Sequence, residues 1–168
     1  MMFNSELSEA ASKLLAQCRL KKFRLSTVES CTGGLVSGLL TSVAGSSDVF
    51  EAGFTTYSND AKLRLIGVSA ELVRRHGAVS ECVARAMAEL TLSAVPQSDI
   101  ALSVTGIAGP GGGSTAKPVG LVHVAAARRG LPTIHRELKL GDIGREAIRL
   151  RSVRVAIELG SLQALAAP

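Results

Sequence analysis

Two apolar runs separated by a glycine-rich stretch constrain the fold more than any other part of this chain. Val119 to Ala127 is nearly all apolar, and Asp99 to Thr105 is apolar enough for a central strand. The stretch between them, residues 106–118, is too rich in glycine and proline for regular structure. Strands that are buried on both faces need helices on each side of their sheet. The sequence therefore predicts an α/β domain in which a long loop joins two central strands.

The rest of the chain alternates between helical and extended patterns. Further strands are expected at about 24–29, 49–57 and 133–140, and helices at about 5–22, 32–43, 61–66, 70–75, 81–94 and 144–163. Strands separated by helices favour parallel pairing, whereas the tight connection at 128–132 favours an antiparallel pair. We therefore expect a single domain over residues 1–168, with a mixed sheet between layers of helices.

A strand-to-helix turn, Glu29–Gly34, carries the densest group of reactive side chains. It holds a carboxylate, hydroxyls, a thiol and two glycines where a helix N-terminus presents free N–H groups. Oxyanions and phosphates bind well at such turns, and a nucleophile fits there too. The alternative is that Ser30 or Thr32 only caps the helix. No Gly-Lys-Ser/Thr follows and GxGxxG is not completed, so neither a P-loop nor a dinucleotide fold is predicted.

Two further segments could contribute to the same site. Tyr57 ends a strand and Lys62 lies in the first turns of the next helix, so both can project towards one crevice. A buried lysine beside a serine can act as a base, although a solvated helix lysine is the simpler interpretation. The glycine-rich residues 105–113 follow a central strand, where a loop suits a phosphate or a flat ring. The alternative there is a flexible surface loop.

Composition excludes several classes of function. The net charge is +5, but the basic residues are scattered and are not interleaved with aromatics, so no nucleic-acid partner is predicted. Steering of small anionic substrates is more plausible. No apolar stretch is long enough to span a bilayer and the N-terminus has no signal-peptide pattern. We expect a cytoplasmic protein with no membrane partner.

Cysteine and histidine spacing predicts neither disulfides nor a metal. The three cysteines have no CxxC spacing, which favours a reducing compartment. The three histidines have no spacing that pairs them with each other or with a cysteine, so no metal is predicted. Cys31 could replace Ser30 as the nucleophile, but it lacks an obvious histidine partner and fits better as a small buried hydrophobe.

Several short segments occur in a fixed order along the chain. They are Glu29–Gly34, Gly45–Ser47, Tyr57–Asn59 with Lys62, His76–Ser80, Val104–Pro110 and Lys117–Gly120. Together they resemble the C-terminal domain of the competence/damage-inducible CinA family, whose stand-alone members are nicotinamide-nucleotide amidases. The resemblance covers about residues 5–163. It implies a three-layer α/β/α domain with a mixed, mostly parallel sheet, assembled as a homo-oligomer.

The resemblance also implies an activity, the hydrolysis of the carboxamide of nicotinamide mononucleotide to nicotinic acid mononucleotide and ammonia, without a cofactor or metal. It makes Ser30 the nucleophile, Lys62 its base and Tyr57 a hydrogen-bonding relay or orienter. The remaining site residues it implies are Thr32, Gly33 and Gly34 around the oxyanion, Thr105 and Gly106 lining the site, and Lys117 and Arg145 for the phosphate.

Two departures from the family pattern leave other functions open. Gly111 stands where family members often have an aspartate, and residues 141–145 are longer than the usual Gly-Asp-Arg. A non-catalytic, regulatory nucleotide-binding module is therefore the alternative to an enzyme. A purely structural domain is a third possibility, although it would not need serine, tyrosine and lysine to coincide with glycine turns.

Overall fold

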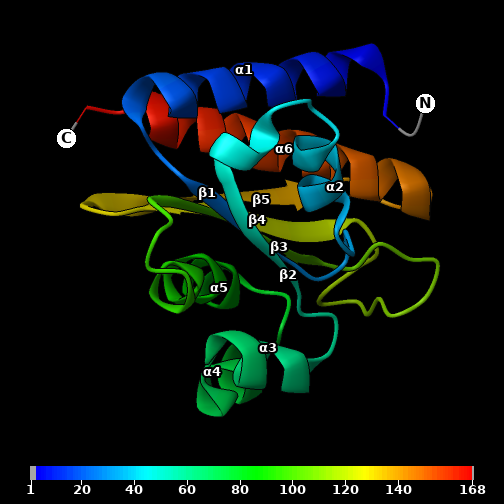
Figure 1. The fold of residues 1–168 in the computed structure, drawn as a ribbon. Coiled ribbons are helices and arrows are strands. Elements are labelled where there is room, and N and C mark those ends of the chain that lie inside the picture. Colours follow the sequence, from blue (N-terminus) through cyan, green and yellow to red (C-terminus); the bar gives the residue numbers. More distant parts are fainter. Residues whose placement is uncertain (1–2, 168) are drawn as a thin grey trace.

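A computed structural model describes residues 3–167 as a five-stranded sheet covered by helices on both faces (Figure 1). The strand order is β2-β1-β3-β4-β5. The strands are β1 (Leu25–Glu29), β2 (Phe50–Thr55), β3 (Ile100–Gly106), β4 (Leu121–Arg128) and β5 (Leu131–Lys139). The predicted α/β class and its three layers are confirmed.

Strand direction follows from the connections between strands. β1 pairs parallel with both β2 and β3, while β4 pairs antiparallel with β3 and β5. Only β4 therefore runs against the other strands. The sheet is mixed, as expected, with two parallel and two antiparallel pairings. The carboxyl ends of β1, β2 and β3 meet at one edge, together with the start of β4. Ser30, Thr56 and the loop after Gly106 consequently lie at this same edge.

Helices form two layers on opposite faces of the sheet. α1 (Ser5–Lys21), α2 (Leu35–Thr41) and α6 (Arg145–Leu165) cover one face, and α3 (Asn59–Ile66), α4 (Ala70–His76) and α5 (Glu81–Ala94) lie on the other (Figure 1). A short 3-10 helix, η1 (Ser46–Asp48), precedes β2. None of the helices in the described residues is long and apolar enough to cross a membrane.

Each layer buries a separate apolar cluster. Leu14, Leu39 and Ile157, from the three helices of the first layer, are fully or almost fully buried in the largest cluster. Burying a leucine or isoleucine side chain in such a core contributes about 1.5–3 kcal/mol. On the other face, Ala84 and Met87 of α5 are fully buried in smaller clusters. The sheet edge that carries the polar residues is therefore held by packing on both faces.

The second helix begins later than the sequence predicts. It was expected from residue 32, but α2 starts at Leu35. Gly33 and Gly34 have φ values of 60° and 94°, which are left-handed conformations that glycine adopts at little cost. The chain therefore makes a tight turn between β1 and α2, and this turn presents Ser30 at the edge of the sheet.

Candidate active site

Ser30 and Lys62 form a buried pair at the carboxyl edge of the sheet. Ser30 directly follows β1, and its N–H donates to the carbonyl of Val104 on β3 at 2.9 Å. The Nζ of Lys62, on α3, lies 3.0 Å from the Oγ of Ser30. Lys62 also donates to the carbonyl of Thr56 at 2.8 Å. The side chains that the family resemblance implied as nucleophile and base are in hydrogen-bonding contact.

Burial changes the acid–base behaviour of this lysine. Lys62 is only 1% exposed, and its loss of solvent lowers its pKa below the ordinary value of 10.5. The solvated-lysine alternative is therefore wrong. A neutral amine can donate to the Thr56 carbonyl and still accept a proton from the Ser30 hydroxyl. The geometry thus supplies a hydroxyl with an adjacent general base.

The buried carboxylate of Glu29 holds the turn after Ser30. No separate role for this residue was predicted from the sequence. Glu29 is fully buried and accepts hydrogen bonds from the N–H groups of Gly34, Val36 and Ser37 at 2.9–3.1 Å. Gly34 occupies the N-cap position and provides no side-chain cap. The alternative in which Ser30 or Thr32 caps α2 is therefore wrong, since Glu29 occupies the helix N-terminus.

The glycine N–H groups in this turn are already engaged. Gly33 donates to the carbonyl of Ser30 at 3.0 Å, and Gly34 donates to Glu29 at 3.1 Å. Within residues 3–167, the N–H groups of Cys31 and Thr32 have no such acceptor in another residue. The Thr32 hydroxyl is also buried and has no partner among the described residues. Free donors thus remain beside Ser30, but at positions 31 and 32 rather than at 33 and 34.

Arg149, on α6, is a residue of the candidate site that was not predicted from the sequence. Its guanidinium donates to the carbonyls of Cys31 and Thr32 at 3.1 and 2.8 Å. These hydrogen bonds attach the turn, at Cys31 and Thr32, to α6. The sequence contained one indication that Arg149 lies near the site. Arg149 follows Arg145 by four positions and therefore lies on the same helix face.

Tyr57 contacts Arg145 rather than the Ser30–Lys62 pair in the described structure. Its hydroxyl lies 3.0 Å from Nη2 of Arg145, whose Nη1 donates to the carbonyl of Gly109 at 2.7 Å. Tyr57 is 60% exposed, so its side chain is not part of the core. Arg145 thereby joins the segment after β2 to the glycine-rich loop.

Thr105, Gly106 and Lys117 make structural contacts near the site. The Thr105 hydroxyl donates to the carbonyl of Ala78 at 2.9 Å. A Cβ at Gly106 would lie 2.7–2.9 Å from atoms of β4, so the close approach of β4 requires glycine there. Lys117 Nζ donates to two carbonyls before α5, those of His76 and Val79, at 2.6 and 2.7 Å. The glycine-rich loop is therefore attached at both ends rather than free at the surface.

Cys31 is buried beside the pair but is not activated. Burial raises the pKa of its thiol to about 11, so the thiol stays protonated at neutral pH. The reactivity of a cysteine nucleophile depends on its thiolate. Ser30, with Lys62 in contact, is the better candidate for a nucleophile.

Two histidines that appeared unrelated in the sequence are in contact. His123 Nδ1 and His135 Nε2 are 3.0 Å apart across β4 and β5. Their spacing in the sequence gives no sign of this contact, because it is the β4–β5 hairpin that brings the two side chains together. No group of three or more His, Cys, Asp or Glu side chains within residues 3–167 is arranged to hold a metal ion.

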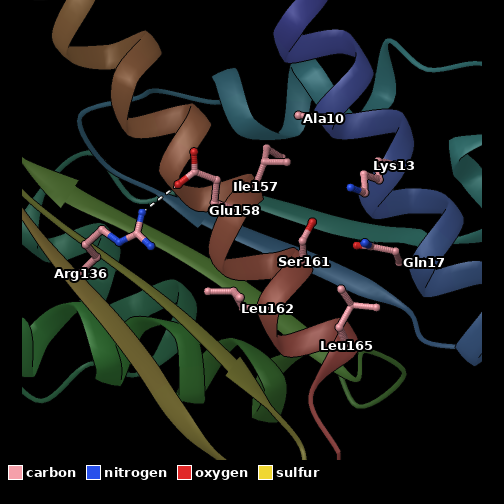
Figure 2. A pocket seen from close by; sticks show the side chains of 9 residues that line it. All are labelled: Ala10, Lys13, Gln17, Arg136, Ile157, Glu158, Ser161, Leu162 and Leu165. Carbon is pink, nitrogen blue, oxygen red and sulfur yellow. Dashed lines mark hydrogen bonds and ion pairs between the residues drawn. The ribbon is translucent and has the colours of Figure 1, made fainter.

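A hollow lies between α1 and α6 (Figure 2), and neither Ser30 nor Lys62 lines it. Its volume is about 390 Å³, and apolar side chains such as Leu162 and Leu165 form much of its wall. Arg136 and Glu158 on its rim pair with each other at 2.8 Å. Lys13 and Ser161 line this hollow, but no hydrogen bond joins them in the part of the chain that the structure describes. Ser30 and Lys62 are in contact, so their region is the candidate active site.

Known proteins resemble this chain in sequence and in fold. The chain is 44% identical over 158 residues to the nicotinamide-nucleotide amidohydrolase PncC of Escherichia coli K12, with 94% of each chain covered. A crystal structure of the competence/damage inducible protein CihA from Agrobacterium tumefaciens superposes with a TM-score of 0.91, at 47% identity and 94% coverage of both chains.

Other relatives are much longer than this chain. A protein of Caldicellulosiruptor bescii is 54% identical over 123 residues, which are 73% of this chain but 29% of that protein. The chain thus spans less than a third of that relative. The family model for the CinA C-terminal domain matches residues 7–163. The chain therefore belongs to the CinA C-terminal domain family.

Proposed function

We propose that this chain is an amidohydrolase that converts nicotinamide mononucleotide to nicotinic acid mononucleotide and ammonia. The observation that carries the proposal is the 3.0 Å contact between Lys62 Nζ and Ser30 Oγ in a buried setting. A lysine base and a serine nucleophile suffice for acyl transfer without histidine. The E. coli relative that aligns over 94% of both chains is a nicotinamide-nucleotide amidohydrolase, which supports this substrate.

The reaction would proceed in two halves. Neutral Lys62 takes the proton of Ser30 as Oγ attacks the carboxamide carbon. The ammonium of Lys62 then returns that proton to the departing nitrogen, which leaves as ammonia and gives a Ser30 ester. In the second half, Lys62 deprotonates a water that attacks the ester. As the ester C–O bond breaks, the ammonium of Lys62 returns the proton to Ser30 Oγ. The acid product leaves as its carboxylate after it loses its own proton to solvent.

Charge that develops on the carboxamide oxygen needs donors close to Ser30. We assign this role to the N–H groups of Cys31 and Thr32, because those of Gly33 and Gly34 are engaged within the turn. Arg149 supports the assignment, since it holds the carbonyls of both residues. Removing one such donor in a serine hydrolase costs about 10²–10³-fold in kcat.

The charged end of the substrate would bind near Tyr57 and Arg145. Arg145 is exposed, and a guanidinium suits a phosphate. Lys117 is a weaker candidate, because its ammonium donates to two backbone carbonyls. We further propose that the enzyme acts in the cytoplasm as a homo-oligomer and needs no metal or cofactor, because Ser30 and Lys62 supply the nucleophile and the base.

A direct assay tests this function. The purified chain is incubated with nicotinamide mononucleotide, and ammonia and nicotinic acid mononucleotide are both measured. Equal amounts of the two products are expected, with none from a Ser30→Ala variant. The second candidate function, a nucleotide-binding module, is favoured by Gly111 at the usual aspartate position. Calorimetry that shows binding without ammonia release would support this second function instead.

A further inference from the structure

We propose that Glu29 is a positioning residue for catalysis. Its side chain fixes the turn that carries Ser30, and its backbone carbonyl accepts a hydrogen bond from Thr56, which in turn contacts Lys62. The inference rests on the proposed function, because it concerns how the Ser30–Lys62 pair is kept in register. Nothing in the activity itself requires a carboxylate at this place, since Glu29 contacts neither Ser30 Oγ nor Lys62 Nζ through its side chain.

The carboxylate of Glu29 is fully buried and fully engaged. One oxygen accepts from the N–H groups of Gly34 and Val36 at 3.1 and 3.0 Å. The other accepts from the N–H and the hydroxyl of Ser37 at 2.9 and 3.0 Å. A buried carboxylate is costly unless its oxygens are hydrogen-bonded, and here four donors compensate for that cost. The first turn of α2 is thus closed by a residue that lies before the turn.

This arrangement fixes Ser30 from both sides. Glu29 is the last residue of β1, immediately before Ser30. Its side chain accepts hydrogen bonds from the chain between Gly34 and Ser37. Residues 30–33 are therefore a short arch whose two ends are held by one residue. Ser30 sits at the start of that arch, and its own N–H is held by Val104. The Oγ position consequently depends on the grip of Glu29 on α2.

The backbone of Glu29 also reaches the base. Its carbonyl accepts the N–H of Thr56 at 2.8 Å, and the carbonyl of Thr56 accepts from Lys62 Nζ at 2.8 Å. Two consecutive hydrogen bonds therefore join Glu29 to Lys62 across β1 and the segment after β2. A shift of β1 at Glu29 would move both members of the pair relative to one another.

The same contacts decide where a substrate anion does not bind. The N-terminus of α2 would otherwise offer free N–H groups to a phosphate or an oxyanion. Because Glu29 takes these donors, the protein supplies its own anion there. A second negative group from a substrate would be repelled, which leaves Arg145 as the better phosphate partner. Glu29 thus separates the nucleophile turn from the charged end of the substrate.

A Glu29→Gln variant of the whole chain tests the proposal. The amide is nearly isosteric, but its NH₂ group would face N–H donors that the carboxylate now accepts. Glu29→Asp keeps the charge on a shorter side chain. Glu51→Gln is the matched control, because this partly exposed carboxylate lies on β2 and pairs with Arg24. Steady-state ammonia release from nicotinamide mononucleotide and thermal unfolding are measured for each variant.

We expect Glu29→Gln to lower kcat by about 10- to 100-fold with KM within about twofold, as a small misplacement of reacting groups does. Glu29→Asp should recover part of the loss, and Glu51→Gln should match wild type. The pH at which kcat/KM reaches half its maximum should rise in Glu29→Gln, because a loosened pocket admits water around Lys62. If Glu29 only stabilised the fold, Glu29→Gln would lower the melting temperature. It would leave kcat and this pH profile unchanged at temperatures where the variant is folded.

Three outcomes separate the possibilities. Wild-type kcat and pH profile in folded Glu29→Gln would overturn the inference and leave the proposed function intact. No ammonia from the wild type would overturn the proposed function; an NMR titration of Lys62 Nζ in wild type and Glu29→Gln would then test the positioning role, with equal pKa values counting against it. If Glu29→Gln does not fold, Ser37→Ala removes one of the four donors, and an unchanged kcat there would refute the proposal.

Discussion

The amine of Lys62 lies 3.0 Å from the hydroxyl of Ser30, although 32 positions separate the two residues in the chain. Ser30 leaves β1 and Lys62 enters α3, so the parallel pairing of β1 with β2 brings them to the same edge. Both side chains are buried, which strengthens their interaction and keeps water from the amine. The first prediction follows directly from this contact.

Ser30→Ala should abolish ammonia release, with a loss in kcat of at least about 10³-fold, as removal of a catalytic serine does elsewhere. Cys31→Ser is the matched variant. Because burial raises the pKa of Cys31 to about 11, its thiol takes no part, and kcat should stay within a few-fold of wild type. Turnover at the wild-type rate in Ser30→Ala would contradict the assignment of the nucleophile.

Lys62 should set the acidic limb of the pH profile. Burial lowers its pKa below 10.5, and only the neutral amine can accept the Ser30 proton. Activity should therefore rise with pH up to the lowered pKa and then level off. Lys62→Met should lower kcat by about 10²–10⁴-fold and remove this limb from any residual activity. A limb that persists unchanged in Lys62→Met would assign it to another group.

The sequence indicated the candidate site through residue types at strand ends. A serine after one strand and a lysine after the next are brought together whenever those strands pair in parallel, and this could be predicted. The apolar runs likewise predicted the sheet and both helical layers. The adjacent glycines at 33 and 34 indicated a turn. Their positive φ values, because of which α2 begins only at Leu35, could not be read from the sequence.

Contacts between distant segments could not be predicted. The pairing of Tyr57 with Arg145 spans 88 positions and depends on where α6 crosses the sheet. The engagement of Glu29 with α2 could have been suspected, because a glutamate shortly before a helix start can reach its N–H groups. The histidine pair depends on the register of β4 with β5, in which His123 faces Glu137 and Ala125 faces His135.

Tyr57→Phe should separate two roles for the tyrosine. Its hydroxyl lies 3.0 Å from Arg145 Nη2, so we expect it to orient Arg145 rather than to relay a proton. KM for nicotinamide mononucleotide should rise by about two- to tenfold with little change in kcat, since one partly exposed hydrogen bond is lost. Arg145→Gln should raise KM further. A fall of about 10²-fold in kcat in Tyr57→Phe would instead support the relay.

The phosphate assignment predicts a substrate comparison. If Arg145 binds the phosphate, its removal should lower kcat/KM more for nicotinamide mononucleotide than for nicotinamide riboside, which lacks that group. Loss of a charged hydrogen bond costs about 1.5–3 kcal/mol, or about 10- to 150-fold in kcat/KM. Steady-state kinetics of wild type and Arg145→Gln with both substrates measures the difference. An equal loss for both substrates would place the phosphate elsewhere.

The stacked pair His123–His135 should make the fold sensitive to mild acid. Burial lowers the pKa of both imidazoles below 6.5 in the folded state, while the unfolded chain titrates near that value. Between these pKa values the unfolded chain binds more protons, so the free energy of unfolding should fall as the pH drops below about 6.5, before carboxylates titrate.

The charges around the pair determine how large this effect becomes. Glu81 lies 3.6 Å from His135 Nδ1 and Glu137 lies 3.8 Å from His123 Nε2, and both favour protonation. Burial, Lys117 and Arg85 oppose it, and burial is the largest influence on both histidines.

Denaturant unfolding between pH 5 and 8 measures the effect. His123→Gln/His135→Gln should flatten the decline in this window, whereas His76→Gln, at an exposed position, should keep it. An equally steep decline in the double variant would show that other groups cause the acid sensitivity.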